Sequence, residues 1–394
     1  MRVMSVARPG TIAGLMAAVV LLVGSNVVGT AAAATLDTAA RQAILIDVST
    51  DTVLFEKNST QRMPTSSMSK IMTMYMVFDA LHHGKLSLTD TLPVSERAWR
   101  MQKTSGSNTF VELGNRIKVE DLVRGVIVQS GNDAAIVFAE GLAGSEDAFS
   151  REMTKRAKEL GLSDSNFTNS TGWPDDNHYS TARDLALLSR TLIRDFPEYY
   201  AYFSELEFTY HKIRQANRNV LLDPKRGCKG CDGIKTGHAE SAGYGLAASA
   251  IRDGRRLVLV INGLPTSLAR GEEGVRLIEW GFREFSPFEL FKPGQVVDEA
   301  PVWLGAQATV PLVVAEGLKV TLKQDERKGM KVTLSMDVPV PAPVVKGTRL
   351  GKITISAPGF IVREVPVIAG ASVERLGLVG KMVAAAKWYV LGRT

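Results

Sequence analysis

Residues that bind metals or form disulfides are scarce in this sequence. Its 394 residues include two cysteines, Cys228 and Cys231, and five histidines. One C-x-x-C pair without a second pair makes a poor zinc site, and the lack of an H-E-x-x-H motif argues against a zinc peptidase. No βαβ pattern surrounds the two cysteines, which argues against a thioredoxin-like redox role. We therefore expect no metal and no cofactor, and the two cysteines form either a small disulfide or a pair of inert thiols.

A strong excess of one charge is also missing. The formal net charge is +6, and it falls to +4 without residues 1–34, which hold two arginines and no acidic residue. So small and dispersed a charge gives no basis for nucleic-acid binding. It suits work near an anionic lipid surface or an anionic polymer.

The first 34 residues have the composition of a secretory signal peptide. Arg2 and Arg8 precede an apolar run over residues 12–28, and Ala32–Ala34 supplies the small residues of a cleavage site. An uncleaved anchor is the alternative. We expect a signal peptide over residues 1–34 and an exported protein.

The segment Ser66–Phe78 is the one around which the rest of the chain is organised. Pro64 lies just before it and Gly84 follows its last apolar turn, so both ends of a helix are marked. The segment is apolar on nearly every side, which is typical of a helix in the middle of a core. Ser67 and Lys70 are three residues apart, so they share a helix face. A hydroxyl beside an amine is the layout of an activated nucleophile, although a capping serine with an extended lysine is the simpler alternative.

The chain up to about residue 291 predicts a mixture of strands and helices. Residues 87–117 are polar and read as a surface loop. The stretch from Gly233 to His238, which contains Lys235-Thr236-Gly237, stands just before a strand. We expect a hairpin of strands 43–48 and 52–56, strands 243–251 and 256–263, and helices 119–128, 134–142, 146–160, 180–193 and 270–285.

The composition changes near residue 292. Up to about residue 369 the chain is rich in Val, Thr and Pro, with alternating polar and apolar residues. This pattern predicts a small all-β domain, with a hairpin formed by strands 319–323 and 331–334. The last segment, residues 370–394, has apolar residues at helical spacing together with basic residues, and is too charged to span a membrane. We expect an amphipathic helix on a membrane surface, with a helix docked on its own protein as the alternative.

Three short motifs stand in order along the chain: Ser67–Lys70 (S-x-x-K), Ser130–Asn132 (S-G-N) and Lys235–Gly237 (K-T-G). Average residue usage gives on the order of one S-x-x-K and about 0.1 K-T-G by chance in a chain of this length. Each occurs here once, at a helix start, between two helices and beside a strand. Together they mark penicillin-binding proteins and class A β-lactamases.

The sequence resembles the low-molecular-mass penicillin-binding proteins, the serine D-alanyl-D-alanine carboxypeptidases. Besides the three motifs, Glu279–Arg283 is similar to a family segment, while the pair Cys228/Cys231 departs from it. The resemblance implies an α/β (α+β) catalytic domain like that of penicillin-binding proteins and serine β-lactamases, with a mainly antiparallel sheet flanked by helices. The expected domains are a signal peptide (1–34), a catalytic domain (35–291), a small β-sandwich (292–369) and an amphipathic membrane-anchor helix (370–394).

The resemblance also implies roles for the residues that react. Ser67 is expected to attack the carbonyl of the D-Ala-D-Ala bond and to form an acyl-enzyme. Lys70 would accept its proton as a neutral amine, favoured by burial and by the neighbouring cation Lys235. Ser130 would relay a proton to the leaving amine. The backbone N–H groups of Ser67 and His238 would form the oxyanion hole.

Four further residues are expected to bind the substrate. Asn132 would hold the substrate amide, and Thr236 would bind the terminal carboxylate next to Lys235. Gly237 lets the strand approach the substrate closely. Arg270 would assist in binding the carboxylate, with a surface salt bridge as the alternative.

Related activities share these motifs. A β-lactamase of class A needs a glutamate for deacylation, and the loop 166–177 contains none. A DD-endopeptidase would share every motif, and a catalytically silent wall-binding protein would lack the serine or the lysine. The sequence thus predicts a carboxypeptidase that acts on peptidoglycan stem peptides and is acylated by β-lactams. We expect it on the periplasmic side of the cytoplasmic membrane, attached to the inner-membrane surface through its C-terminal helix.

Overall fold

A computed structural model describes residues 36–104, 106–358 and 363–383. The expected signal peptide, residues 1–34, lies outside the described residues, as does the part of the expected tail helix from residue 384 onward. The chain divides into a short N-terminal unit that ends at Asp37 and a main unit that begins at Thr38. Everything below concerns the main unit.

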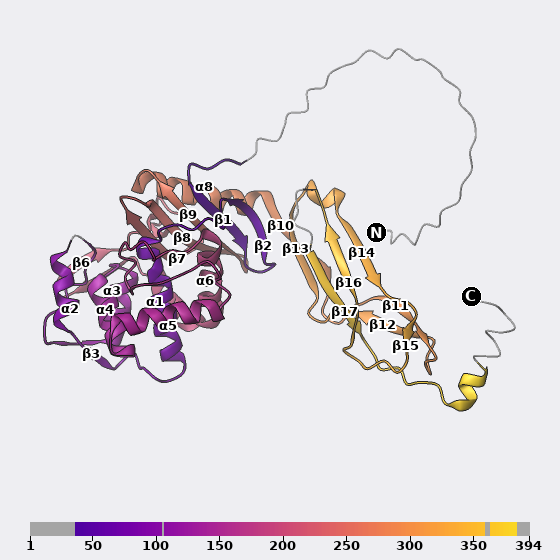
Figure 1. The fold of residues 1–394 in the computed structure, drawn as a ribbon. Coiled ribbons are helices and arrows are strands. Elements are labelled where there is room, and N and C mark those ends of the chain that lie inside the picture. Colours follow the sequence, from indigo (N-terminus) through magenta and orange to yellow (C-terminus); the bar gives the residue numbers. More distant parts are fainter. Residues whose placement is uncertain (1–35, 105, 359–362, 384–394) are drawn as a thin grey trace, which may run out of the picture. The chain divides into compact units, whose positions relative to one another are not determined.

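One antiparallel sheet organises the first part of the main unit (Figure 1). Its strand order is β2-β1-β9-β8-β7, so the first hairpin of the chain pairs with strands from about 200 residues later. Both β2 and β7 are edge strands. The five strands are β1 (Gln42–Asp47), β2 (Thr52–Lys57), β7 (Cys231–Ala239), β8 (Gly243–Arg252) and β9 (Arg255–Leu264).

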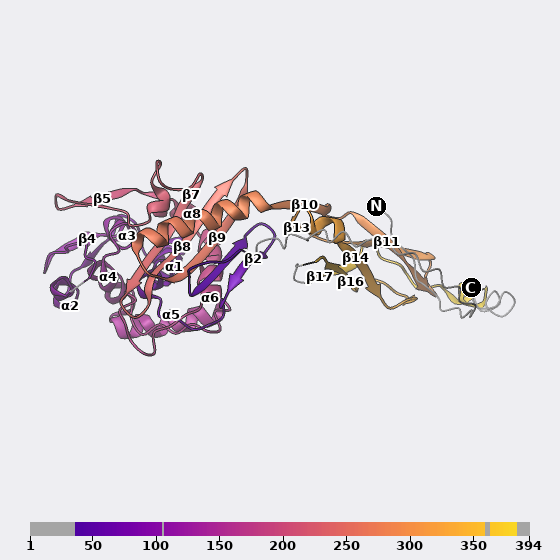
Figure 2. The same cartoon turned by 90° about the horizontal axis from the view of Figure 1, so that it is seen from above.

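The two faces of this sheet bury alternate residues, as the period of a strand requires. Ile44 and Ile46 on β1 belong to the large core that the helical block shares. Leu45, between them, faces helix α8 (Ser267–Glu284), where a Cβ added to Gly281 would lie 2.7 Å from the Leu45 side chain. Figures 1 and 2 show α8 on one side of the sheet and the helical block on the other. The sheet is therefore buried on both faces.

Helix α1 (Lys70–His82) is at the centre of the helical block, and ten of its thirteen residues are buried. Three of the neighbouring helices, α2, α5 and α6, begin at serine or threonine caps. Ser95, Ser145 and Thr181 accept hydrogen bonds from the backbone N–H three residues later. The helices around α1 are α2 (Glu96–Arg100), α3 (Val119–Ile127), α4 (Asn132–Ala143), α5 (Glu146–Glu159), α6 (Ala182–Asp195) and α7 (Pro197–Tyr200), with 3-10 turns η1 (Ser66–Ser69), η2 (Met101–Lys103), η3 (Ala201–Ser204) and η4 (Val220–Leu222).

The expectation of a loop over residues 87–117 was wrong. Strands β3 (Thr91–Pro93) and β4 (Arg116–Lys118) pair with each other, and α2 lies between them. The Ser95 cap starts this helix and Ala98 is fully buried, so a local cap and one apolar contact stabilise a segment that is polar overall. A second short ribbon, β5 (Glu207–Tyr210) with β6 (Ile213–Ala216), precedes β7.

The part after α8 is all-β, as expected, with its own apolar core of residues such as Val310, Leu312 and Ile353. The expected hairpin between strands 319–323 and 331–334 was wrong. The first pairs with β10 and the second with β16, because the turn η5 (Glu326–Gly329) carries the chain from one sheet to the other. The sheets are β10 (Phe285–Phe291) with β13 (Leu318–Lys323), and β14-β16-β17-β12-β11-β15, comprising β14 (Lys331–Met336), β16 (Arg349–Ser356), β17 (Arg363–Ala369), β12 (Thr309–Val313), β11 (Val296–Trp303) and β15 (Val340–Pro341).

Candidate active site

Two consecutive helical segments place the expected nucleophile beside its expected base. Ser67 lies in η1, and Lys70 is the first residue of α1. The Lys70 Nζ atom is 3.1 Å from Ser67 Oγ. The spacing of three residues therefore puts the two groups in hydrogen-bond contact, as the sequence predicted.

Lys70 is fully buried, and its amine has two further partners from distant parts of the chain. Its Nζ atom is 2.7 Å from Asn132 Oδ1 and 2.6 Å from the backbone oxygen of Thr171. A neutral amine has two N–H bonds and one lone pair. If the N–H bonds serve the two oxygens, the lone pair is left facing Ser67 Oγ, which is the arrangement that a general base requires.

The surroundings of Lys70 favour this neutral form. Burial, and then the positive charge of Arg218, lower the pKa of Lys70 to about 7. The carboxylates of Asp133 and Glu146 act in the opposite direction. A large fraction of Lys70 is thus uncharged near neutral pH.

The connection between α3 and α4 presents the second motif. Ser130 has a φ of +59°, a left-handed conformation that few residues other than glycine adopt. Its hydroxyl is buried and has no hydrogen-bond partner among the residues that the structure describes. Asn132, two residues on, begins α4 and contacts Lys70. The tight turn therefore brings the Asn132 amide to Lys70 and places the unpartnered Ser130 hydroxyl two residues before it in the chain.

Sequence reasoning missed the residue that secures this turn, Asp133. Its buried carboxylate accepts hydrogen bonds from the backbone N–H groups of Thr109, Phe110 and Val111, at 2.8 to 3.2 Å. Burial raises the pKa of Asp133, and these hydrogen bonds oppose the rise. Its only signal in the sequence is its place beside Asn132, because its partners come from a polar stretch with no motif.

The third motif lies within edge strand β7, whereas the sequence placed it just before a strand. Lys235 and Thr236 are buried, and β7 pairs with β8 on one side only. A Cβ added to Gly237 would lie 2.8 Å from the backbone oxygen of Thr65 and 3.2 Å from Met68 Cγ. Glycine therefore allows β7 to approach the segment that carries the nucleophile. The third motif and the first are in contact at this point.

Three basic residues, Lys70, Arg218 and Arg270, lie close enough to Lys235 on this strand to affect its pKa. Burial and the charges of Lys70, Arg218 and Arg270 lower the pKa of Lys235 well below its ordinary value. Arg270, on α8, is buried, and its Nη1 atom is 3.5 Å from the backbone oxygen of Gly237. Burial lowers the pKa of Arg270 to about 10. The positive charge at this end of β7 suits an anionic ligand group.

Arg218 is the cation that sequence reasoning missed. It donates a hydrogen bond to Ser107 Oγ, and its backbone oxygen accepts one from Arg270 Nη2 at 3.4 Å. It belongs to no motif, and it stands 17 residues before Lys235 in a segment without regular structure.

The remaining predicted residues lie at the two ends of β7. His238 is exposed, and its ring stacks on Tyr244 at a centroid distance of 3.9 Å. Cys228 and Cys231 form a disulfide, and Cys231 is the first residue of the strand. The disulfide thus closes the turn before β7, four residues from Lys235.

A buried histidine contacts the segment that carries the nucleophile, and no motif in the sequence marked it. His178 Nε2 is 2.6 Å from Ser69 Oγ, and its Nδ1 accepts a hydrogen bond from the backbone N–H of Thr168. Burial lowers the pKa of His178 to about 4, so its ring is neutral at pH 7. The neutral ring holds η1 against the loop that follows α5.

Two family models match the chain. The D-alanyl-D-alanine carboxypeptidase family model, Peptidase S11, matches residues 28–266. The model of the C-terminal domain of penicillin-binding protein 5 matches residues 285–375. Together they span the catalytic part and the all-β part described above.

Similar proteins and solved structures agree with these matches. The chain is 39% identical to the D-alanyl-D-alanine carboxypeptidase DacC of Escherichia coli, over 87% of this chain and 86% of the relative. Penicillin-binding protein 5 of Haemophilus influenzae has a similar structure, with a TM-score of 0.80, 35% identity and coverage of 86% of this chain and 99% of that one. Penicillin-binding protein D2 of Listeria monocytogenes, solved with ampicillin bound, has a TM-score of 0.56 and 30% identity, and covers 63% of this chain and 99% of its own.

Proposed function

The chain belongs to the D-alanyl-D-alanine carboxypeptidase family, and on that basis we propose how its side chains carry out the reaction. It is a serine-type hydrolase that removes the terminal D-alanine from peptidoglycan stem peptides. The observation that carries the assignment of roles is the 3.1 Å contact between Lys70 Nζ and Ser67 Oγ, with the pKa of Lys70 lowered to about 7.

The first step is attack by Ser67. Neutral Lys70 takes the hydroxyl proton while Ser67 Oγ bonds to the carbonyl carbon of the penultimate D-alanine. The negative charge that develops on the carbonyl oxygen is stabilised by the backbone N–H groups of Ser67 and His238. The product of the step is a tetrahedral adduct with a protonated Lys70.

The second step expels D-alanine. The C–N bond breaks, and protonated Lys70 returns its proton to the leaving nitrogen through Ser130, whose buried hydroxyl has no partner among the described residues. The acyl group remains on Ser67 as an ester. Water then attacks the ester carbon, Lys70 again accepts a proton, and Ser67 Oγ leaves with one.

The cationic end of β7 gives the enzyme its requirement for a free carboxyl terminus. We infer that the terminal carboxylate of the substrate binds at the buried residues Thr236 and Lys235, with Arg270, 3.5 Å from the backbone oxygen of Gly237, as a second cation. Asn132 would hold the substrate's amide. Burial and neighbouring cations lower the pKa of Lys235, and an entering carboxylate favours its protonated form, so binding favours an anionic group.

Intact-mass measurement after adding benzylpenicillin tests this proposal. We expect a single covalent adduct that maps to Ser67 on digestion. Ser67→Ala should abolish it, whereas Ser163→Ala, which removes an exposed hydroxyl, should leave it unchanged. No adduct on Ser67, together with intact drug, would overturn the assigned nucleophile.

The lifetime of that adduct separates the proposed peptidase from a β-lactamase. The loop 166–177 lacks a glutamate. The buried Glu146 accepts hydrogen bonds from Ser170 and an ion-pair contact from Arg97. Because the loop has no glutamate and Glu146 is already engaged by protein groups, we expect the acyl-enzyme to persist for many minutes. Rapid loss of the adduct with turnover of the drug would indicate a β-lactamase.

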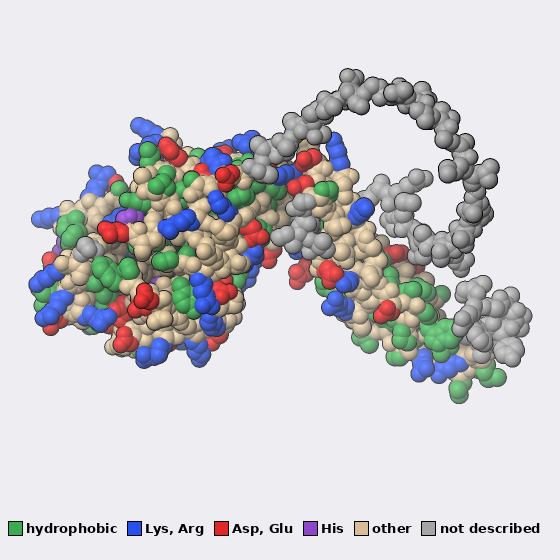
Figure 3. Space-filling model, turned by 45° about the horizontal axis from the view of Figure 1, so that its top comes forward, with side chains coloured by type: hydrophobic (Ala, Val, Ile, Leu, Met, Phe, Trp, Pro, Cys, Tyr) green, Lys and Arg blue, Asp and Glu red, His purple; other side chains and the backbone are tan. Residues whose placement is uncertain are grey.

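We also propose that the chain attaches peripherally to the inner-membrane surface. The described start of the tail, residues 378–383, is helical and carries Leu378, Val379 and Met382 at 81, 76 and 74% exposure. Figure 3 shows hydrophobic and basic side chains close together at the neighbouring end of the all-β part. In the described part of the chain no helix has the length and apolar character needed to cross a bilayer.

A truncation tests this attachment. Val373 is buried and pairs with Val344, so removal should begin only after that contact. We expect deletion of residues 378–394 to release an enzyme that reacts normally with benzylpenicillin and no longer sediments with vesicles of anionic phospholipid. A truncated protein that still sediments with the vesicles would exclude the tail as the anchor.

A further inference from the structure

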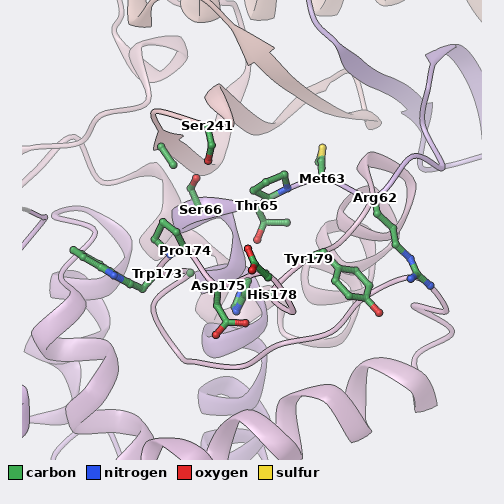
Figure 4. Close-up of a pocket in the computed structure, with 14 residues that line it drawn as sticks. Arg62, Met63, Thr65, Ser66, Trp173, Pro174, Asp175, His178, Tyr179 and Ser241 are labelled. Atoms are coloured by element: carbon green, nitrogen blue, oxygen red, sulfur yellow. The ribbon is translucent and has the colours of Figure 1, made fainter.

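Three buried polar side chains next to the nucleophile form hydrogen bonds with one another, and the steps proposed above use none of them. Thr65 precedes η1, Ser69 is the last residue of η1, and His178 comes from the loop that follows α5. They are 1, 0 and 4% exposed. Ser69 Oγ lies 2.6 Å from His178 Nε2 and is also hydrogen-bonded to Thr65 Oγ1. We call these three side chains the Ser69 network, and its two outer members line one cavity (Figure 4).

The direction of each hydrogen bond in the network is fixed. The backbone N–H of Thr168 lies 3.1 Å from His178 Nδ1, and because a backbone N–H only donates, Nδ1 is an acceptor. Burial lowers the pKa of His178 to about 4, so the neutral ring carries its one proton on Nε2 at pH 7. Nε2 therefore donates to Ser69 Oγ, and the Ser69 hydroxyl donates its own proton to Thr65 Oγ1.

The histidine end of the network is held by the backbone around it. Tyr179, directly after His178, exchanges two backbone hydrogen bonds with Asn166, at 2.9 and 3.0 Å. Ser180 exchanges two more with Met63, at 2.8 and 3.2 Å, shortly before η1. The ring is therefore presented from a segment that is fixed both to its own loop and to the chain that leads into η1.

The other end of the network lies at the nucleophile. Ser67 stands midway between Thr65 and Ser69 in the sequence, so the network holds the residues on both sides of it. The backbone oxygen of Thr65 accepts a hydrogen bond from the Met68 N–H at 3.1 Å, and it lies 2.8 Å from a Cβ added to Gly237. Ser69 is the N-cap residue of α1, yet its hydroxyl makes no capping hydrogen bond. That hydroxyl is thus committed to the network.

We propose that His178 is a positioning residue for the nucleophile. Acting through the other two members of the Ser69 network, it holds Ser67 so that Oγ faces Lys70 and the backbone N–H faces the carbonyl oxygen of the substrate. None of the three side chains takes part in a proton transfer of the reaction. A misplacement of reacting groups by about 1 Å can cost about 10²-fold in rate, so such positioning affects catalysis strongly. The inference rests on the proposed function, which gives Ser67 its two roles.

Two amide side chains separate the two nitrogens of the ring. His178→Gln can place an amide N–H where Nε2 stands and keep the donor to Ser69, whereas His178→Asn reaches only to the position of Nδ1. We measure kcat and KM for release of D-alanine from Nα-acetyl-L-lysyl-D-Ala-D-Ala. We expect kcat to fall about tenfold to 10²-fold in His178→Asn and in Ser69→Ala, and less than about threefold in His178→Gln. KM should stay within about twofold throughout, because the groups proposed to bind the carboxylate lie on β7 and α8.

A buried hydroxyl outside the network is the matched control. Ser165 is 0% exposed and lies in the same loop, where its Oγ bonds to Ser180 and Asp184. Ser165→Ala should lose stability and keep the wild-type kcat. The double variant Ser69→Ala/His178→Asn should be no slower than the slower single variant, because both changes break the same network.

The remaining outcomes are decisive in the other direction. A wild-type kcat in Ser69→Ala, an equal loss in Ser165→Ala, or a His178→Gln enzyme as slow as His178→Asn would overturn the positioning role. If the wild type releases no D-alanine from the peptide, the carboxypeptidase function itself fails. The same variants are then compared by the rate of Ser67 acylation by benzylpenicillin. The same order of rates would support the positioning role, and equal rates would exclude it.

Discussion

The catalytic part and the all-β part bury different kinds of side chain. The catalytic part buries Lys70, Lys235, Asp133 and Glu146, whereas Thr321 is the one buried polar residue among the described residues of the all-β part. Burying a charge is unfavourable unless it is paired or hydrogen-bonded. The all-β part has a core of apolar residues. Among the described residues the buried charges lie in the catalytic part, near Ser67 and also elsewhere, as at Asp47 of β1, which pairs with Arg255.

The largest effect should follow from removing the buried amine. Lys70→Met keeps an unbranched side chain, one heavy atom shorter, and removes the proton acceptor of Ser67. We expect the rate of acylation by benzylpenicillin to fall by about 10²- to 10⁴-fold, the usual contribution of a general base. Lys85→Met, at an exposed position just after α1, should react at the wild-type rate. A Lys70→Met protein that acylates within tenfold of wild type would remove Lys70 from the mechanism.

Replacing a buried carboxylate should lower the free energy of unfolding more than replacing an exposed one. Asp133→Asn replaces an acceptor of several backbone hydrogen bonds with a group that also donates. We expect the free energy of unfolding to fall by about 2 to 3 kcal/mol, measured by denaturant titration. Asp337→Asn, at an exposed site in the all-β part, should change it by less than about 0.5 kcal/mol. Equal effects at the two sites would contradict the distinction between the regions.

The pH dependence of acylation should report the charge around Lys70. Because only the neutral amine accepts a proton, the rate should fall about tenfold per pH unit below the pKa of about 7. Arg218 lowers this pKa, so Arg218→Gln should move the acid limb to higher pH and reduce the rate at pH 7 several-fold.

The matched control is Arg214→Gln, which removes an exposed arginine of β6 that pairs with Glu207. Its pH profile should coincide with that of the wild type. An Arg218→Gln profile with an unmoved acid limb would show that Arg218 does not set the charge of Lys70.

The sequence was sufficient to predict the fold class and the contact between Ser67 and Lys70, because a fixed helical spacing determines that contact. It also singled out Ser130 and Lys235 through their motifs. The sequence did not predict the residues that lie outside any motif and still contact or electrostatically influence the site. Arg218 is the clearest example, since nothing local distinguishes it from the other arginines.

The sequence also did not predict which strands pair in the all-β part. Local alternation identified strands at 319–323 and 331–334 correctly, yet each pairs with a strand elsewhere. Alternation tells which residues face a core and is silent about the partner strand. The 3-10 turn η5 between them made a direct hairpin impossible, and its sequence looks like an ordinary polar turn.

The smallest effect on activity should come from the core of the all-β part. Leu312 is fully buried, so Leu312→Ala should destabilise that part by about 2 to 5 kcal/mol. Acylation by benzylpenicillin should keep its wild-type rate, because none of the groups proposed for the reaction lies there. Leu122→Ala, equally buried in α3, should lower both the stability and the rate. If Leu312→Ala slows acylation as strongly as Leu122→Ala does, the catalytic part and the all-β part form one cooperative unit. The arrangement of the buried charges in the catalytic part then depends on the apolar core of the all-β part.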